Sequence, residues 1–135
     1  IMKEITLKEW SAYLPYGLKL WYEDNKDIYP LVVSNNTVSI RGGFNINDVK
    51  SYNLKPILYD LSWLTREITH EGETFIPLYK LQKIDKAFVL TFIETFGYEE
   101  LKVEVFELLL EWRFNVFSLP NELIVRVTED FNPYK

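Results

Sequence analysis

The chain contains no cysteine and only one histidine among its 135 residues. Without cysteine it cannot form a disulfide, a thiolate metal site or a cysteine nucleophile. With a single histidine it cannot supply the paired imidazole ligands of most transition-metal sites, so we expect neither a metal nor another cofactor. The absence of cysteine also fits a reducing cytoplasm, where we expect the protein to act.

Long apolar runs and an excess of basic charge are also missing. No run approaches the roughly 20 apolar residues of a membrane-spanning helix, and no signal peptide is evident, so no membrane partner is expected. The net charge of −5 arises entirely in residues 68–135, with seven basic against twelve acidic residues, because residues 1–67 carry eight of each. Since nucleic acids are bound mainly through clustered Lys and Arg, this balance argues against a nucleic-acid partner.

Aromatic residues, by contrast, are plentiful, with 4 Trp, 9 Tyr and 9 Phe. Because each such side chain buries roughly 150–250 Å², a few of them can form the core of a chain of this length. Ile1 precedes Met2 and is taken as an addition to the native start. We therefore expect a single α+β domain over residues 2–135.

The first part of the chain predicts a helix followed by a small antiparallel β-meander. Thr6 and Glu9 have the spacing of a capping box, and Pro15-Tyr16-Gly17 would end the helix that they begin. Three strand-like runs then alternate with turn-forming residues such as Asn35-Asn36. The runs are Leu18–Tyr22, Ile28–Ser34 and Thr37–Arg41.

The second part predicts several helices packed against the meander. Asp60 would cap a short helix that extends to Ile68, and further helical segments are expected over Leu78–Ile84 and between Asp85 and Gly97. Short strands are expected at Thr74-Phe75-Ile76 and Leu123–Thr128. The longest element is a helix from Glu99 to Phe117, apolar over most of its circumference, which we expect to be the long central core helix near the C-terminus.

Four glutamates in that segment, Glu100, Glu104, Glu107 and Glu111, are spaced by four, three and four residues. On a helix this spacing places their carboxylates on one narrow side. A solvated helix face is the simplest interpretation, and an acidic ridge that binds a basic protein surface is the alternative. Metal binding is not predicted, because di-iron bundles need Glu-x-x-His pairs that one histidine cannot supply.

A second candidate binding surface lies among the aromatic residues near the N-terminus. Trp21 and Tyr22 are neighbours on a predicted strand, so their side chains point to opposite faces of the sheet. If one side chain belongs to the core, the other is exposed or covered by a partner. Both are therefore interface candidates, with packing of the first helix on the meander as the alternative role.

No catalytic constellation is evident. His70-Glu71 resembles the start of a zinc-protease signature, but Thr74 occupies the position of the second histidine, and we expect His70 to be a solvent-exposed turn residue. The carboxylates of Asp60, Glu71 and Glu73 are the candidates for a small carboxylate-dependent hydrolase. No catalytic residue is assigned from the sequence, and we expect a protein that is not an enzyme.

Three segments carry a resemblance to a known family: Leu14-Pro15-Tyr16-Gly17-Leu18-Lys19, Lys55–Leu58 leading into Leu61–Ile68, and Glu111–Phe117. In this order they resemble a family of small uncharacterised proteins encoded by phages and prophages of Bacteroidetes bacteria. The resemblance implies a cytoplasmic setting in an infected or lysogenic bacterium. It implies no activity and no functional residues.

Two classes of function follow from these observations. The first is a phage- or prophage-type protein that binds, and thereby modulates, an unknown protein, host-encoded or phage-encoded. The second is the carboxylate-dependent hydrolase, and a self-assembling structural component of a phage is a further alternative. Homo-oligomerisation is compatible with the first and the last of these.

Overall fold

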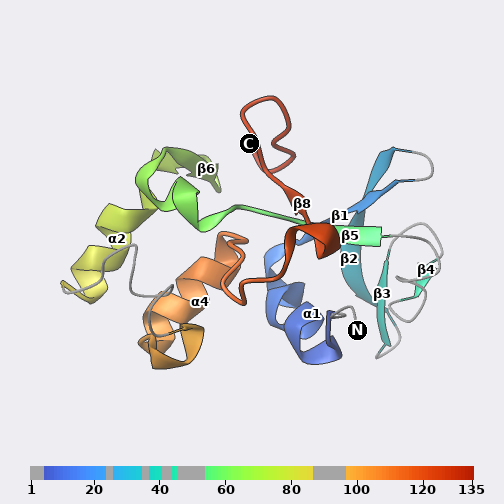
Figure 1. Cartoon of the computed structure of the whole chain (residues 1–135), viewed down its shortest axis with the longest axis horizontal. Helices are drawn as coiled ribbons and strands as arrows, with labels where there is room; N and C mark the ends of the chain where they lie inside the picture. Colours follow the sequence, from blue (N-terminus) through green and yellow to red (C-terminus); the bar gives the residue numbers. More distant parts are fainter. Residues whose placement is uncertain (1–4, 24–25, 35–36, 41–43, 46–53, 87–96) are drawn as a thin grey trace. The chain divides into compact units, whose positions relative to one another are not determined.

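The computed structural model describes residues 5–23, 26–34, 37–40, 44–45, 54–86 and 97–135, shown in Figure 1 as coloured ribbon. These residues form an α+β fold in two units. The first unit comprises Ile1–Leu58 and Leu119–Arg126, and the second comprises Tyr59–Ser118 and Val127–Lys135. The expectation of one domain over residues 2–135 stays a prediction.

The first unit begins with the predicted helix. The backbone N–H of Thr6 donates to Oε1 of Glu9 at 3.0 Å, and the N–H of Glu9 donates to Oγ1 of Thr6 at 3.2 Å, so the capping box is confirmed. Helix α1 (Leu7–Tyr13) continues into a 3-10 turn, η1 (Leu14–Tyr16). Gly17 then adopts the left-handed conformation with φ 70°, which suits a residue without Cβ and ends the helix.

The strands described in the first unit form a mixed sheet, with the strand order β4-β3-β2-β1-β5-β8. Neighbours pair antiparallel except β5 and β8, which run parallel, and the β1–β2–β3 meander is confirmed. The predicted connector Asn35-Asn36 lies outside the described residues. The strands are β1 (Lys19–Tyr22), β2 (Asp27–Ser34), β3 (Thr37–Ile40), β4 (Phe44–Asn45), β5 (Leu54–Leu58) and β8 (Val125–Arg126).

The last strand is shorter than the sequence predicts. A 3-10 turn, η5 (Asn121–Leu123), occupies the start of the expected strand Leu123–Thr128, and only β8 pairs with the sheet. Its two residues lie opposite Ile57 and Leu58 of β5. Both of these β5 side chains are completely buried, so β5 belongs to the core of the first unit.

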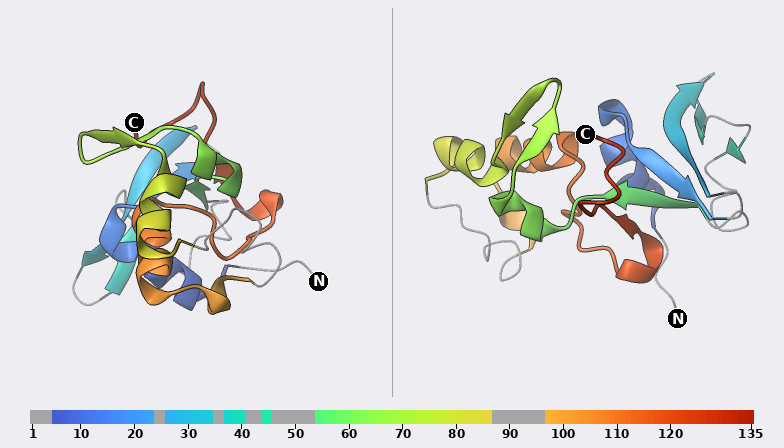
Figure 2. Two further views of the ribbon diagram at one scale, coloured as in Figure 1. Left: turned by 90° about the vertical axis from the view of Figure 1, so that its left-hand side faces the viewer. Right: turned by 90° about the horizontal axis from the view of Figure 1, so that it is seen from above.

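In its described residues the second unit contains a hairpin, two helices and two 3-10 turns. Strands β6 (Ile68–His70) and β7 (Glu73–Phe75) pair antiparallel, and α2 (Pro77–Ile84) packs against both η3 (Leu61–Thr65) and α4 (Val103–Glu111). Figure 2 shows α2 and α4 lying side by side beneath the hairpin. The predicted helical segment Leu78–Ile84 and the strand at Thr74-Phe75 are confirmed, whereas Ile68 lies in β6 rather than in a helix.

The hairpin turn consists of two residues with positive φ. Glu71 has φ 51° and Gly72 has φ 79°, and His70 pairs with Glu73 across them. Two successive positive φ angles define a type I′ turn, whose twist matches that of the flanking strands. This turn explains why the polar tetrapeptide His70-Glu71-Gly72-Glu73 forms the end of a hairpin.

The prediction of a long central helix from Glu99 to Phe117 is wrong. A separate 3-10 turn, η4 (Tyr98–Glu100), precedes it, Leu101 and Lys102 are extended, and α4 contains only nine residues. At its end the N–H of Arg113 donates to Leu110 O and the N–H of Phe114 donates to Leu109 O, both at 2.9 Å. With Arg113 at φ 63°, these bonds form a Schellman motif that ends the helix.

The apolar side of α4 nevertheless packs as expected. Val105 and Leu109 are completely buried, and Trp112 at the end of the helix is 3% exposed, whereas Glu104 and Glu107 are exposed. The helix thus belongs to the core of the second unit although it is short. Most of the predicted helix between Asp85 and Gly97 lies outside the described residues.

Candidate binding surfaces

Trp21 and Tyr22 lie on β1, which is hydrogen-bonded to β2 on one side and to β5 on the other. Both side chains are half-buried, in contrast to Leu20, which is completely buried. Trp21 shares its face of the sheet with its cross-strand partners Ile28 and Lys55. Tyr22 lies on the opposite face with Leu20. The structure therefore leaves part of an aromatic ring accessible on each face.

The indole of Trp21 is held by a charged acceptor. Its Nε1–H donates to Oε2 of Glu23 at 2.5 Å, and Nζ of Lys26 lies 3.3 Å from the other carboxylate oxygen. The hydrogen bond from Trp21 lowers the pKa of the Glu23 carboxyl below its ordinary value, and Lys26 adds to this effect. On the other face, Tyr22 packs against Tyr29 with 6.0 Å between ring centroids. Both aromatic side chains therefore have defined orientations.

The predicted row of glutamates is divided between two elements. Glu104, Glu107 and Glu111 lie on α4 with the expected spacing, whereas Glu100 belongs to η4 and precedes the extended residues. Glu100, Glu104 and Glu107 are exposed, and Glu111 is half-buried. Three carboxylates therefore form a stripe along one side of α4, and the stripe ends at Glu111.

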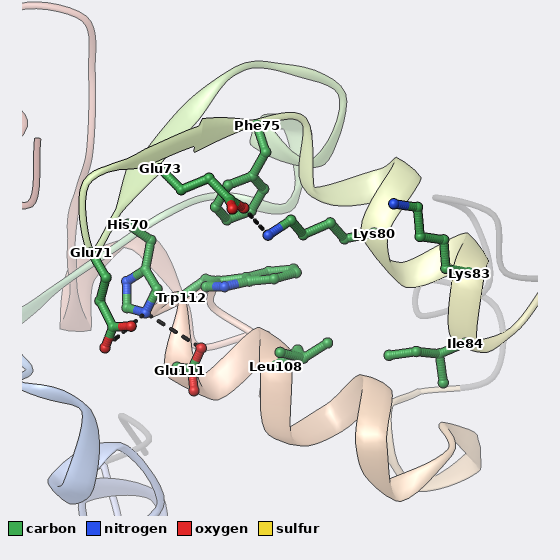
Figure 3. A pocket seen from close by; sticks show the side chains of 10 residues that line it. All are labelled: His70, Glu71, Glu73, Phe75, Lys80, Lys83, Ile84, Leu108, Glu111 and Trp112. Carbon is green, nitrogen blue, oxygen red and sulfur yellow. Dashed lines mark hydrogen bonds and ion pairs between the residues drawn. The ribbon is translucent and has the colours of Figure 1, made fainter.

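Glu111 lies at the edge of a cleft in the second unit, shown in Figure 3, with a volume of about 480 Å³. The hairpin β6–β7, α2 and the end of α4 supply its lining. The apolar part consists of Phe75, Ile84, Leu108 and Trp112, and the polar part consists of His70, Glu71, Glu73, Lys80, Lys83 and Glu111. The indole of Trp112 lies across the middle of the cleft (Figure 3).

An aromatic pair and an ammonium group dominate one side of this cleft. The rings of Phe75 and Trp112 have centroids 5.0 Å apart. Nζ of Lys80 lies 4.0 Å from the centroid of Phe75 and forms an ion pair with Glu73. Lys80 therefore makes a cation–π contact and a charge-assisted hydrogen bond at the same time.

His70 occupies the opposite end of the cleft. Its Nε2 lies 3.3 Å from Oε2 of Glu111 and 3.8 Å from Oε1 of Glu71. The side chain is only 11% exposed, so the expectation of a solvent-exposed turn residue is wrong, because His70 ends β6 and its ring turns inward. Among the described residues, the buried Nε2 has no partner in hydrogen-bond geometry.

The carboxylates considered for hydrolysis separate into two places. Glu71 and Glu73 line the cleft with His70, whereas Asp60 caps η3 by accepting the N–H of Ser62 at 3.2 Å. Within the described ranges, no three histidine or acidic side chains are grouped so that they could hold a metal ion. The cleft therefore presents groups for proton transfer and for charge recognition.

Sequence reasoning missed the cleft because its lining combines the hairpin and α2, which are consecutive in the chain, with the end of α4, which lies much further along it. The sequence places Glu111 in the row of glutamates, Glu71 and Glu73 among the candidate carboxylates of a hydrolase, and His70 in a solvent-exposed turn, and it does not bring these residues together. The available signal was the tetrapeptide after Thr69, whose glycine permits a two-residue hairpin turn that brings residues 70 and 73 opposite each other.

Compared with protein-family models, curated proteins and solved structures, the chain gives no match. Among the residues that the structure describes, no helix combines the length and the apolarity that a membrane crossing requires. Function is therefore inferred from residues and geometry.

Proposed function

We propose that the protein acts by binding another protein, with the sheet face around Trp21 as its main anchor. The observation that carries this proposal is the half-buried position of Trp21, which leaves part of its surface accessible, on a strand that is paired on both edges. A tryptophan at such a position can bury a large area while losing few rotatable bonds. Tyr22 presents a second ring on the other face and is the weaker anchor, because it packs on Tyr29.

The surroundings of Trp21 support this role. Ile28 continues the apolar surface across the strand, whereas Lys55, Glu23 and Lys26 carry charges around it. An apolar centre with a polar rim is the arrangement typical of protein interfaces. The hydrogen bond to Glu23 holds the indole in one orientation, which reduces the entropy lost on binding.

The partner that we propose is a protein of the host or of the phage, met in the bacterial cytoplasm. This context comes from the resemblance to proteins of Bacteroidetes phages and prophages. The glutamates of α4 would act as an electrostatic rim that accelerates association with a basic partner, since rim charges chiefly affect association rates. The same anchor would serve homodimerisation if the partner is a second copy of this chain.

The test is affinity capture from a Bacteroidetes lysate with quantitative mass spectrometry, comparing wild type with Trp21→Ala. Tyr79→Ala is the matched control, because Tyr79 is 63% exposed on α2 and its loss removes a similar ring elsewhere. A partner should be enriched by wild type and Tyr79→Ala and lost, by about fivefold or more, with Trp21→Ala. Equal capture by all three proteins, with no dimer in light scattering, would contradict the proposal.

A carboxylate-dependent hydrolase is the second candidate, favoured by the meeting of His70, Glu71 and Glu111 in one cleft. A panel of chromogenic esters, phosphoesters and glycosides tests it. Turnover that falls by about 100-fold or more in Glu111→Gln would support the cleft as an active site. Absence of turnover, or turnover that persists in this variant, would exclude it.

A further inference from the structure

We infer that the cleft between the β6–β7 hairpin, α2 and α4 binds the cationic side chain of a lysine or arginine on a partner protein. This inference rests on the proposed function only in taking the partner to be a protein. It concerns a surface of the second unit that does not include Trp21. The contacts inside the cleft carry it in three steps.

The first step is the combination of aromatic rings with carboxylates. The faces of aromatic rings attract organic cations within about 6 Å, and Phe75 and Trp112 form such a pair at one side of the cleft. The carboxylates of Glu73 and Glu111 line the same cleft. Rings and carboxylates together recognise an ammonium or guanidinium group better than either does alone. The face of the ring attracts the positive charge, and the carboxylate accepts hydrogen bonds from the N–H groups.

The second step is that the cleft already contains a cation of this kind. The ammonium of Lys80 lies over Phe75 at 4.0 Å and pairs with Glu73, so the protein's own lysine makes the contacts that we assign to a partner's side chain. Lys80 remains 38% exposed, and its four-carbon stem can turn toward water. It would therefore act as an internal competitor that an incoming cation displaces.

The third step is the charge around the cleft. Its lining carries three carboxylates, Glu71, Glu73 and Glu111, against the two ammonium groups of Lys80 and Lys83. Arg113, just beyond the cleft, attracts Glu71 and Glu111 but does not line it. From Glu111 the stripe of Glu107 and Glu104 continues along α4, so a cation that approaches along this side of the helix passes three carboxylates before it reaches the cleft.

The size of the cleft also suits a long basic side chain. A volume of about 480 Å³ can hold the methylene stem as well as the charged head. Leu108 and Ile84 provide an apolar surface for that stem, in the manner in which Lys and Arg stems pack on apolar surfaces elsewhere.

The inference is tested with three capped pentapeptides that have lysine, norleucine or glutamate between pairs of glycines. Norleucine retains the apolar stem of lysine without its charge. Each peptide is titrated into ¹⁵N-labelled protein, and the indole N–H signals of the 4 tryptophans are followed, with Trp112 assigned through Trp112→Phe. The lysine peptide should shift the Trp112 signal saturably and should bind at least about threefold more tightly than the norleucine peptide.

Three variants sharpen the test. Glu111→Gln should weaken binding of the lysine peptide by about threefold or more, whereas Glu67→Gln is the matched control, because that exposed glutamate of the second unit does not line the cleft. Lys80→Met removes the competing ammonium but retains the stem, so it should tighten binding by about threefold. Thermal melts confirm that each variant is folded.

Equal binding of the lysine and norleucine peptides, preference for the glutamate peptide, or weaker binding by Lys80→Met would overturn the inference. So would the absence of any Trp112 shift. These results are separable from the test of the proposed function, because Trp21→Ala should leave the peptide titration unchanged. Capture of a partner that depends on Trp21, without peptide binding in the cleft, would overturn this inference alone.

Discussion

The hydroxyl of Tyr59 donates a hydrogen bond to Oδ1 of Asn132 at 3.2 Å, which joins two residues that are 73 positions apart. The N–H of Tyr59 also donates to Arg113 O, and its C=O accepts the N–H of Asn115, both at 2.9 Å. Its ring packs against those of Trp63, Phe114 and Tyr134. Tyr59 therefore ties the end of α4 and the C-terminal segment into the core of the second unit.

We expect Tyr59→Ala to reduce the free energy of unfolding by about 3–5 kcal/mol, because it removes a buried aromatic ring from this core. Tyr59→Phe should cost only about 0.5–1.5 kcal/mol, since the ring stays and Asn132 Oδ1 still accepts the N–H of Tyr134 at 3.1 Å. Urea denaturation measures both values. Similar losses for the two variants would show that the hydrogen bond, and not the packing, dominates.

Stability should fall at alkaline pH through the same residue. Burial raises the pKa of Tyr59 above its ordinary value of 10.0, although the hydrogen bond with Asn132 and the charge of Arg113 oppose this shift. The folded state then holds the phenolic proton more tightly than the unfolded chain does, so unfolding becomes easier as the pH rises above about 10. The urea midpoint should decline less for Tyr59→Phe than for the wild type between about pH 9 and about pH 11, roughly one unit below and above the ordinary pKa of tyrosine.

The orientation of α4 leads to a pair of contrasting expectations. Leu109→Ala should destabilise the protein by about 2–5 kcal/mol, because the side chain is completely buried. Glu107→Gln should change stability by less than about 0.5 kcal/mol, because its carboxylate is exposed. Thermal and urea denaturation provide both values, and equal losses would contradict the burial of this helix side.

Gly72 is required by the backbone of the hairpin turn. A Cβ at this position would meet no atom within 4 Å, so the cost of Gly72→Ala is confined to the positive φ of 79°. We expect a loss of about 1–2 kcal/mol. Gly72→Asn is the matched variant and should cost less, because asparagine enters the left-handed region more readily. An alanine variant as stable as the wild type would contradict the type I′ turn.

The hydrogen bond between Trp21 and Glu23 should be visible in an acid titration. Because the pKa of Glu23 is lowered from its ordinary value of 4.5, the stabilising effect of the carboxylate is present above that pH and lost as the pH falls through the lowered pKa. The indole N–H signal of Trp21 should therefore shift with a midpoint below 4.5. Glu23→Gln should abolish this titration, and a midpoint above the ordinary value would contradict the contact.

Much of the fold could be predicted because its signals are local. The Thr6–Glu9 capping box, the three strands of the meander and the burial of Leu109 each depend on residues that are neighbours on one element. Propensity, capping chemistry and apolar spacing act over a few residues, so they can be read from the chain alone.

The wrong prediction of the helix from Glu99 to Phe117 has an equally definite cause. The helix expected to reach Phe117 ends at Glu111, because Arg113 takes the left-handed conformation that glycine usually marks. Phe114 then aligns with Tyr59 in an isolated parallel bridge, and Asn115 donates to the same residue. No pattern within Glu99–Phe117 reveals Tyr59 as their partner, because Tyr59 lies more than fifty residues earlier in the chain.

The sequence by itself determined the α+β class, the meander, the charge imbalance and the exposed stripe on α4. Only the tertiary structure decided that this stripe ends at a cleft, that His70 turns inward beside Glu111, and that Lys80 covers Phe75. The physical reason is that periodicity specifies which side of an element is apolar. Which side chains then meet depends on how separate elements pack against one another, whether they are consecutive, as β7 and α2 are, or distant in sequence, as β6 and α4 are.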